Sequence, residues 1–151
     1  MTTPKQIDVI TTDGGLTNLF TAPNPLAEHK TGQIELVELK AKDGTPLYGR
    51  MIKPSNFDKN KKYPVLVYVY GGPGIQLITN SWNAGASLWM NWLAEQGYIV
   101  FTIDNRGTSN RGRKFKEVIH RRCGTIEIED QLVGVEYLTS LSFVNSDRMA
   151  V

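Results

Sequence analysis

Apolar and polar side chains alternate along residues 7–12, the turn sequence Asp13-Gly14-Gly15 follows, and residues 16–21 form a second strand-like run. A period of two is typical of strands with one covered face, so the pattern predicts a β-hairpin. The segment Ala22-Pro23-Asn24-Pro25 then begins a polar connector. Because two strands alone are marginally stable in water, we expect residues 1–31 to be the end of a larger unit, with a domain boundary near residue 31.

A second hairpin is predicted where the alternating runs 34–40 and 47–53 flank Asp43-Gly44, and both of its strands should lie near a sheet edge. The pattern changes after the polar loop 54–62. Residues 65–70 and 98–103 form short, unbroken apolar runs that are rich in β-branched and aromatic side chains. Such runs are typical of strands covered on both faces, and residues 148–151 resemble the first step of a further strand.

Apolar positions at spacings of three and four predict helices between these strands. The first helix should carry its apolar stripe on Ala86, Trp89 and Leu93, and it should end at Gly97. A short helix is expected near residues 115–119, closed by Gly124. The longest helix should begin near Thr125, with acidic side chains in its first turn. Its apolar face is predicted to consist of Ile128, Leu132, Val135 and Leu138.

The order strand, helix, strand, helix, strand predicts an α/β fold. Its parallel sheet should have helices on both faces and should follow the antiparallel hairpin. The sheet is expected to be incomplete, since the last strand would have no neighbour on one side. We therefore divide the chain into residues 1–31, a short β segment, and residues 32–151, the first part of a larger α/β domain.

The composition is that of an ordinary globular domain. The chain has 151 residues, of which 40% are hydrophobic and 21% charged, and its net charge is +2. This balance gives no reason to expect nucleic acid as a partner, and no run approaches the roughly 18 apolar residues of a membrane-spanning helix. A single cysteine, Cys123, excludes an internal disulfide and leaves the compartment undetermined.

A hydrolase of this class needs a nucleophile, usually in a G-x-S-x-G turn between a strand and a helix. The nearest match is Gly107-Thr108-Ser109-Asn110-Arg111, which has arginine in place of the final glycine, so we reject Ser109 as a nucleophile. His29 and His120 are the only candidate bases, and solvated or packed histidines explain both better.

Other ligands have little support. The glycines after Tyr70 lack the spacing and the lysine of a phosphate-binding loop, and the chain offers no spacing of metal ligands, so we expect no metal and no cofactor. The basic residues between Arg111 and Arg122 are interrupted by apolar positions at helical spacing and are interpreted as a solvated helix face. Trp82, Trp89 and Trp92 are expected to be core or interface residues.

Several blocks, in order, resemble the prolyl oligopeptidase family of serine peptidases, and its dipeptidyl peptidase IV branch most. They are Tyr63 to Gly74 (YPVLVYVYGGPG), Asp104 to Thr108 (DNRGT), Arg121 to Gln131 (RRCGTIEIEDQ) and Phe143 to Val151 (FVNSDRMAV). The resemblance covers about residues 34–151. More weakly, residues 1–30 are similar to the last strands of the β-propeller that precedes the family's hydrolase domain.

The resemblance implies an α/β-hydrolase fold, a Ser-Asp-His triad, no cofactor, and release of N-terminal Xaa-Pro or Xaa-Ala dipeptides from peptide substrates. Tyr70 occupies the position whose phenol donates to the oxyanion in the family. Every triad member would lie outside these residues, so the chain would be truncated before the nucleophile turn and inactive alone. The resemblance also suggests a periplasmic or membrane-associated parent protein.

Three interpretations remain open from the sequence. The first is the amino-terminal part of a peptidase domain. The second is a non-catalytic binding or scaffold module with the same fold, and the third is part of an esterase or lipase. Under any of them, Arg106 and the acidic residues Glu127 to Asp130 are interpreted as scaffold, and the open sheet edge predicts self-association.

Overall fold

Two separate β-sheets make up the chain, of which this computed structural model describes residues 4–151. The first is an antiparallel hairpin of β1 (Gln6–Ile10) and β2 (Leu16–Thr21). The second has five strands in the order β3-β4-β6-β5-β7. Their bounds are β3 (Gln33–Lys40), β4 (Pro46–Lys53), β5 (Tyr63–Val67), β6 (Ile99–Asp104) and β7 (Val144–Ala150). Both predicted hairpins and all the predicted strands are therefore present.

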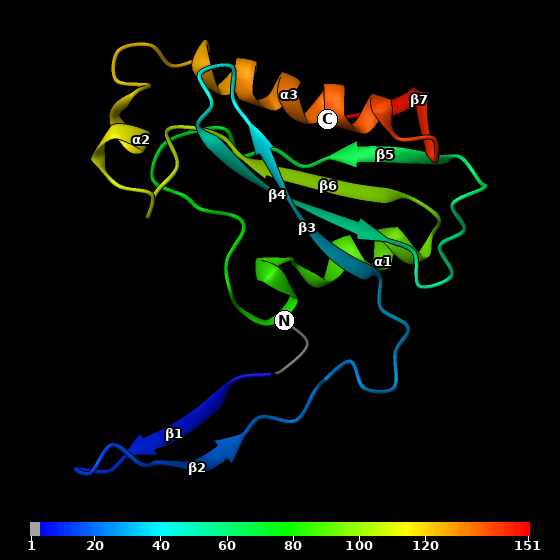
Figure 1. Cartoon of the computed structure of the whole chain (residues 1–151). Coiled ribbons are helices and arrows are strands. Elements are labelled where there is room, and N and C mark those ends of the chain that lie inside the picture. Colours follow the sequence, from blue (N-terminus) through cyan, green and yellow to red (C-terminus); the bar gives the residue numbers. More distant parts are fainter. Residues whose placement is uncertain (1–3) are drawn as a thin grey trace.

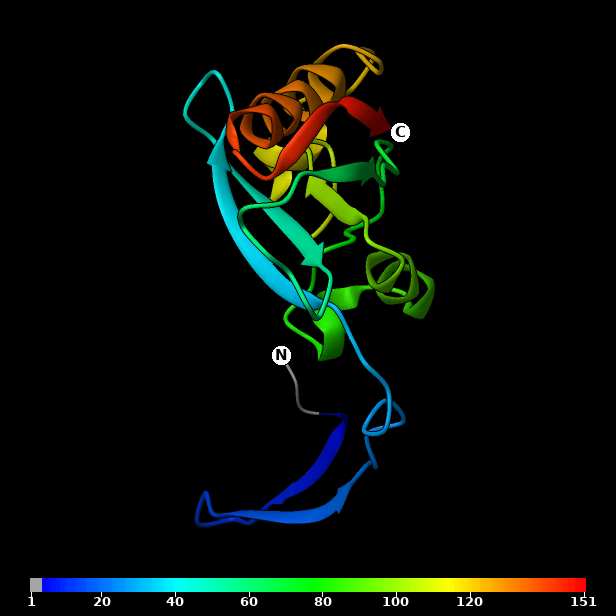
Figure 2. The same ribbon diagram turned by 90° about the vertical axis from the view of Figure 1, so that its right-hand side faces the viewer.

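The five-stranded sheet is mixed. Strands β5, β6 and β7 run parallel, whereas β4 pairs antiparallel with both β3 and β6. The helices are α1 (Leu88–Glu95), α2 (Arg113–Glu117) and α3 (Ile126–Ser140). Helix α1 and helix α3 lie on opposite faces of the sheet (Figures 1 and 2). The chain thus has the expected α/β architecture with helices on both faces.

Strand β6 lies between two apolar layers, which explains why its whole length is buried. Phe101 points to the α3 face and packs in a core cluster with Met51 and Leu138. Val100 points to the α1 face and packs with Met90. A central strand covered by helices on both sides must be apolar at successive positions, and this produced the unbroken run in the sequence.

Three details differ from the sequence-based expectations. Of the two strands of the β3–β4 hairpin, only β3 lies at an edge of the sheet, because β4 also pairs with β6. Strand β5 ends at Val67, so Tyr70 follows the strand instead of ending it. Helix α3 buries Leu138 as predicted, but it exposes more than half of Ile128 and Leu132.

The β1–β2 hairpin lies away from the sheet, beyond α1 and joined to β3 by a long connector (Figure 1). Every residue of both strands is exposed, including the large apolar side chains Ile10, Leu16 and Leu19. Within residues 4–151, no helix combines the length and the apolar composition that crossing a bilayer requires.

Candidate active site at the carboxyl edge of the sheet

Tyr70 lies three residues beyond the end of β5, at the edge where the parallel strands β5 and β6 end. About half of its side chain is exposed (49%). The backbone N–H of Tyr68 still donates to the carbonyl of Phe101 at 2.8 Å, so the chain follows β6 for one residue past the strand. In parallel α/β sheets, ligands bind at this edge, because loops from several strands meet there.

Two glycines turn the chain directly after Tyr70. Gly71 has a φ of +75°, a conformation that residues with a Cβ rarely adopt. A Cβ atom on Gly72 would lie 3.4 Å from the Tyr70 ring, in van der Waals contact with it. The positive φ of Gly71 therefore allows the sharp turn, and Gly72 lies beside the Tyr70 ring.

Asn105, which directly follows β6, is 1% exposed and contacts this turn. Its Nδ2 donates to the carbonyl of Gly71 at 3.2 Å and to that of Arg106 at 2.7 Å. Its Oδ1 accepts a hydrogen bond of 3.0 Å from Nε2 of Gln131 on α3. The same nitrogen donates to the carbonyl of Ile103 at 3.2 Å. The Asn105 amide is thus held on both sides, and one of its donors binds the turn that follows Tyr70.

Asp104, the last residue of β6, binds the far end of the same loop. Its two carboxylate oxygens accept from the backbone N–H groups of Leu77 (2.9 Å) and Ile78 (3.0 Å). Burial raises the pKa of Asp104 above its ordinary value of 3.8, although these hydrogen bonds and the positive charge of Arg50 oppose the shift.

Arg50 on β4 is 1% exposed and fixes the next part of the loop. Its Nη1 donates to the carbonyls of Leu77 (3.1 Å) and Ala84 (2.7 Å). Asn83 and Ala84, in the short turn Trp82–Gly85, have positive φ angles, which are unfavourable for residues with a Cβ. Burial lowers the pKa of Arg50, and the charge of Asp104 opposes that shift. The hydrogen bonds to Arg50 stabilise a strained segment that the sequence alone did not reveal.

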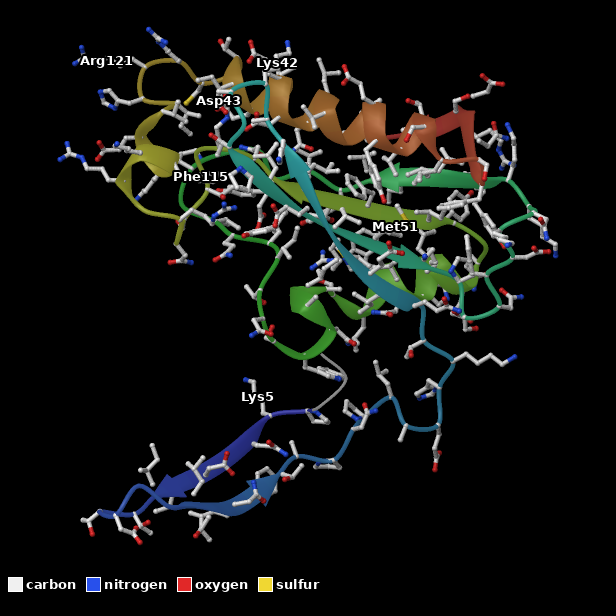
Figure 3. The ribbon with its side chains drawn as sticks, viewed as in Figure 1. Lys5, Lys42, Asp43, Met51, Phe115 and Arg121 are labelled. Carbon is white, nitrogen blue, oxygen red and sulfur yellow. The ribbon has the colours of Figure 1, made fainter. Side chains whose placement is uncertain are left out.

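Arg106 connects three segments at this edge. Its guanidinium and backbone N–H bind both carboxylate oxygens of the buried Asp130 on α3, at distances of 2.7–3.1 Å. Its Nη1 donates to Asp43 at 2.7 Å, and Figure 3 places Asp43 in the turn between β3 and β4, beside the start of α3. The hydrogen bond to Asp130 is the largest factor that raises the pKa of Arg106. These contacts are those of an ion pair that holds loops together, as the sequence predicted.

An apolar groove of about 470 Å³ lies between α3 and the ends of β5 and β7. Its lining contains the exposed α3 side chains Ile128 and Leu132, which the sequence placed on one apolar face with Leu138. The remaining lining residues are Val67, Val69, Gly71, Gly72, Pro73, Cys123, Gly124, Glu127, Gln131, Val135 and Val151. The groove therefore begins beside the Gly71-Gly72 turn and runs along α3.

The other side chains considered in the sequence lie elsewhere. His29 is exposed in the connector and His120 is exposed after α2. The basic residues of α2 are exposed above the buried Phe115, as expected for a solvated helix face. Trp89 and Trp92 are 43% and 63% exposed, so they are not core residues. The described part of the chain contains no cluster of three or more side chains suited to hold a metal.

The sequence did not identify Asn105, Gln131, Asp104 or Arg50 as important. Asp104 and Asn105 belong to the DNRGT block of the family resemblance, but that block does not indicate that the two residues bind opposite ends of one loop. The only signal for these two residues was their position at the end of a buried strand.

Comparison with known proteins places these features in a family context. Residues 85–151 match the prolyl oligopeptidase family. The chain is 39% identical over 118 residues to dipeptidyl peptidase 8 of human and of mouse, an alignment that covers 78% of this chain and 13% of those proteins. It is 35% identical over 129 residues to mouse prolyl endopeptidase FAP, covering 85% of this chain and 16% of that protein.

Two crystal structures have the same fold. A protein of Bacteroides ovatus, provisionally named dipeptidyl aminopeptidase IV, superimposes with a TM-score of 0.94 at 47% identity over 99% of this chain and 22% of its own. Dipeptidyl peptidase 4 of Porphyromonas gingivalis gives a TM-score of 0.76 at 26% identity, covering 97% of this chain and 21% of its own. The chain thus spans only 13–22% of the length of these proteins.

Proposed function

The chain belongs to the prolyl oligopeptidase family, and from this premise we propose that it forms the first part of the catalytic domain of a serine dipeptidyl peptidase. The parent enzyme would remove Xaa-Pro or Xaa-Ala dipeptides from the N-termini of peptides. The observation that carries the proposal is the position of Tyr70. Its phenol is half-exposed at the edge of the sheet where ligands bind, directly before a turn that buried side chains hold in place.

In the proposed mechanism, the Tyr70 hydroxyl donates a hydrogen bond to the oxygen of the scissile carbonyl. When a serine attacks that carbonyl, the oxygen becomes an oxyanion and the hydrogen bond strengthens. A donor held in place before the reaction needs no reorganisation as the charge develops, so it stabilises the transition state more than the substrate. Tyr70 suits this role because the residue is half-exposed at the edge of the sheet where ligands bind.

The serine, the aspartate and the histidine of the triad would come from residues beyond this chain. The handedness of the sheet connections indicates where the next helix of such a domain would lie. The crossover from β6 to β7 carries α3, and a right-handed crossover to a further strand beyond β7 would place its helix on the same face as α3. There it would cover the apolar groove, including Ile128 and Leu132. Residues 1–31 would be the last strands of a preceding β domain, which would bury the exposed side chains of the β1–β2 hairpin.

The test is a Tyr70→Phe substitution in the full-length protein, assayed with a chromogenic Xaa-Pro substrate. Loss of one oxyanion donor should lower kcat by about 10²–10³-fold and leave KM within a factor of about two. Tyr98→Phe, on a partly buried tyrosine before β6, is the matched control and should retain activity. A Y70F variant with full kcat would contradict the proposed role of Tyr70.

A second experiment tests the class of protein. A serine-reactive phosphonate should label the full-length protein but not the 151-residue chain. Labelling of neither, together with the absence of Xaa-Pro hydrolysis, would favour the non-catalytic scaffold. Hydrolysis of acyl esters without dipeptide release would favour the esterase.

A further inference from the structure

The loop after Tyr70 is held at both ends by adjacent residues of β6 and its extension. Asn105 binds the carbonyl of Gly71, and Asp104 binds the N–H groups of Leu77 and Ile78. Asn105 and Asp104 are only 1% and 4% exposed. Because both anchors come from one buried strand end, the two ends of the loop cannot move independently of the central sheet.

Tyr70 itself lies between two fixed points of the backbone. Before it, the N–H of Tyr68 donates to the carbonyl of Phe101 at 2.8 Å. After it, the carbonyl of Gly71 accepts from Nδ2 of Asn105 at 3.2 Å. The direction of the Tyr70 side chain follows from the backbone between these points. Without the second contact, the glycine turn would be free to rotate, since glycine restricts the backbone least.

Gln131 determines which way the Asn105 amide faces. Its Nε2 donates to Oδ1 of Asn105 at 3.0 Å and to the carbonyl of Ile103 at 3.2 Å, so it reaches Asn105 from α3 and is itself bound to β6. With Oδ1 occupied in this way, the NH₂ group of Asn105 must face the Gly71 carbonyl. Helix α3 is already held to this strand end by the contacts between Arg106 and Asp130. Asn105 is therefore not required for that attachment.

We propose that Asn105, oriented by Gln131, is a positioning residue that holds the Gly71 carbonyl and thereby directs the Tyr70 phenol toward the oxyanion. The inference rests on the proposed function of Tyr70. It assigns to a buried amide pair the task of keeping the donor in place before the substrate arrives, since a donor displaced by about 1 Å loses much of its effect.

The kinetic test compares Asn105→Ala, Tyr70→Phe and the double variant in the full-length protein, with Asn60→Ala on an exposed loop as the matched control. N105A should lower kcat by about 10–100-fold with KM within about twofold, and N60A should be unchanged. In the Y70F background, N105A should lower kcat by less than about threefold further, because the two residues act through the same hydrogen bond. Losses that multiply in the double variant would indicate a merely structural role and would overturn the inference.

A second measurement does not depend on activity. In the full-length protein, hydrogen exchange of the backbone amides of Tyr68, Leu77 and Ile78, which are hydrogen-bonded on either side of the turn, should be at least about tenfold faster in N105A, while the amides of β6 and α3 stay protected. If N105A does not fold, Gln131→Ala replaces it and should give smaller changes in the same direction. Unchanged exchange in these variants would overturn the inference.

The two proposals fail in distinguishable ways. Absence of hydrolysis by the wild-type full-length protein would overturn the proposed function, whatever the exchange data show. Normal hydrolysis by the wild type with an unchanged kcat for N105A would overturn the role of Asn105 alone.

Discussion

At the scale of single residues, Arg106 should contribute most to stability among the charged side chains at the carboxyl edge. It is 7% exposed and binds Asp130, which is fully buried, through both carboxylate oxygens. Arg106→Ala would leave that carboxylate buried without its partner, so we expect the free energy of unfolding to fall by about 3–5 kcal/mol, measured by urea denaturation. The free energy of unfolding of Arg106→Lys should lie between those of R106A and the wild type, because lysine keeps the charge but cannot form the paired hydrogen bonds of arginine.

The control is Arg113, whose ion pair with Glu117 is exposed and spans one helical turn. Arg113→Ala should change the unfolding free energy by about 0.5 kcal/mol or less. Equal effects of R106A and R113A would contradict the view that Arg106 holds the loops of this edge together.

Asp104 predicts a pH dependence of stability with an unusual sign. Burial raises its pKa above 3.8, so the folded chain binds this proton more tightly than the unfolded chain. As the pH falls from neutrality through the raised pKa toward 3.8, Asp104 therefore contributes an increase in the free energy of unfolding. Urea denaturation of wild type and Asp104→Asn across this range should show the increase only in the wild type.

Two other aspartates with shifted pKa values affect stability only at more acidic pH, so they do not interfere with this test. Hydrogen bonds from Thr11 and from Thr45 lower the pKa values of Asp13 and Asp43, respectively. A lowered pKa gives stability that is present above 3.8 and is lost at more acidic pH. A difference between wild type and D104N that stayed flat from pH 7 to pH 4 would show that the Asp104 charge is not costly in the folded state.

Residue types alone identified little of the candidate site. The position of Tyr70 became meaningful through the resemblance, since an aromatic residue after an apolar strand is most often a core residue. Asn105 and Gln131 are ordinary polar residues in the sequence. Their role depends on a contact between the end of β6 and a helix residue 26 positions later, and a single sequence does not reveal that contact.

At the scale of elements, the packing of α3 on the sheet depends on Gly134. A Cβ atom there would lie 2.9 Å from the Phe101 ring, and a Cβ atom on Gly49 of β4 would lie 3.2 Å from the same ring. Gly134→Ala gains about 1 kcal/mol of helix propensity but overpacks the core, which typically costs about 1–3 kcal/mol. We expect a net loss of about 1 kcal/mol in urea denaturation.

The partner substitution distinguishes this explanation from a general effect on the helix. In a Phe101→Leu background the ring is absent, and Gly134→Ala should become neutral or stabilising there. A G134A variant that is equally destabilising in both backgrounds would exclude the contact with Phe101 as the cause.

The periodicity of α3 located its apolar face but did not show which part of that face is buried. The helix buries Glu127 and Asp130 in its first turns, because Gly124 and Arg106 supply their hydrogen bonds, and it leaves Ile128 and Leu132 in the groove. Hydrophobic spacing assumes that apolar side chains face the core and charged ones face water. The ion pair of Asp130 with Arg106 near the helix start violates that assumption. The strands were placed within a few residues because their apolar runs remain unbroken.

At the scale of the whole molecule, the open edge of β7 predicts self-association. The strand is the last in the sheet order and is mostly exposed, and Figure 2 shows it at the outside of the sheet. An unpaired edge can add a strand from a second copy. Sedimentation velocity of the 151-residue chain should therefore show association that increases with protein concentration.

Ala150→Lys should weaken this association, because a charged side chain on an edge strand opposes further pairing. Thr139→Lys, on an exposed position of α3, adds the same charge away from the edge and serves as the control. A monomer at all concentrations, or equal effects of the two lysines, would argue against pairing through β7.

The single cysteine lies where a label attached to it would report on the apolar groove. Cys123 is exposed and lines the apolar groove beside α3. A fluorophore attached to this thiol would sense directly whether the groove is open to water or covered by more polypeptide. The rate at which a thiol reagent modifies Cys123 would therefore show, without any substrate, whether further polypeptide covers the groove.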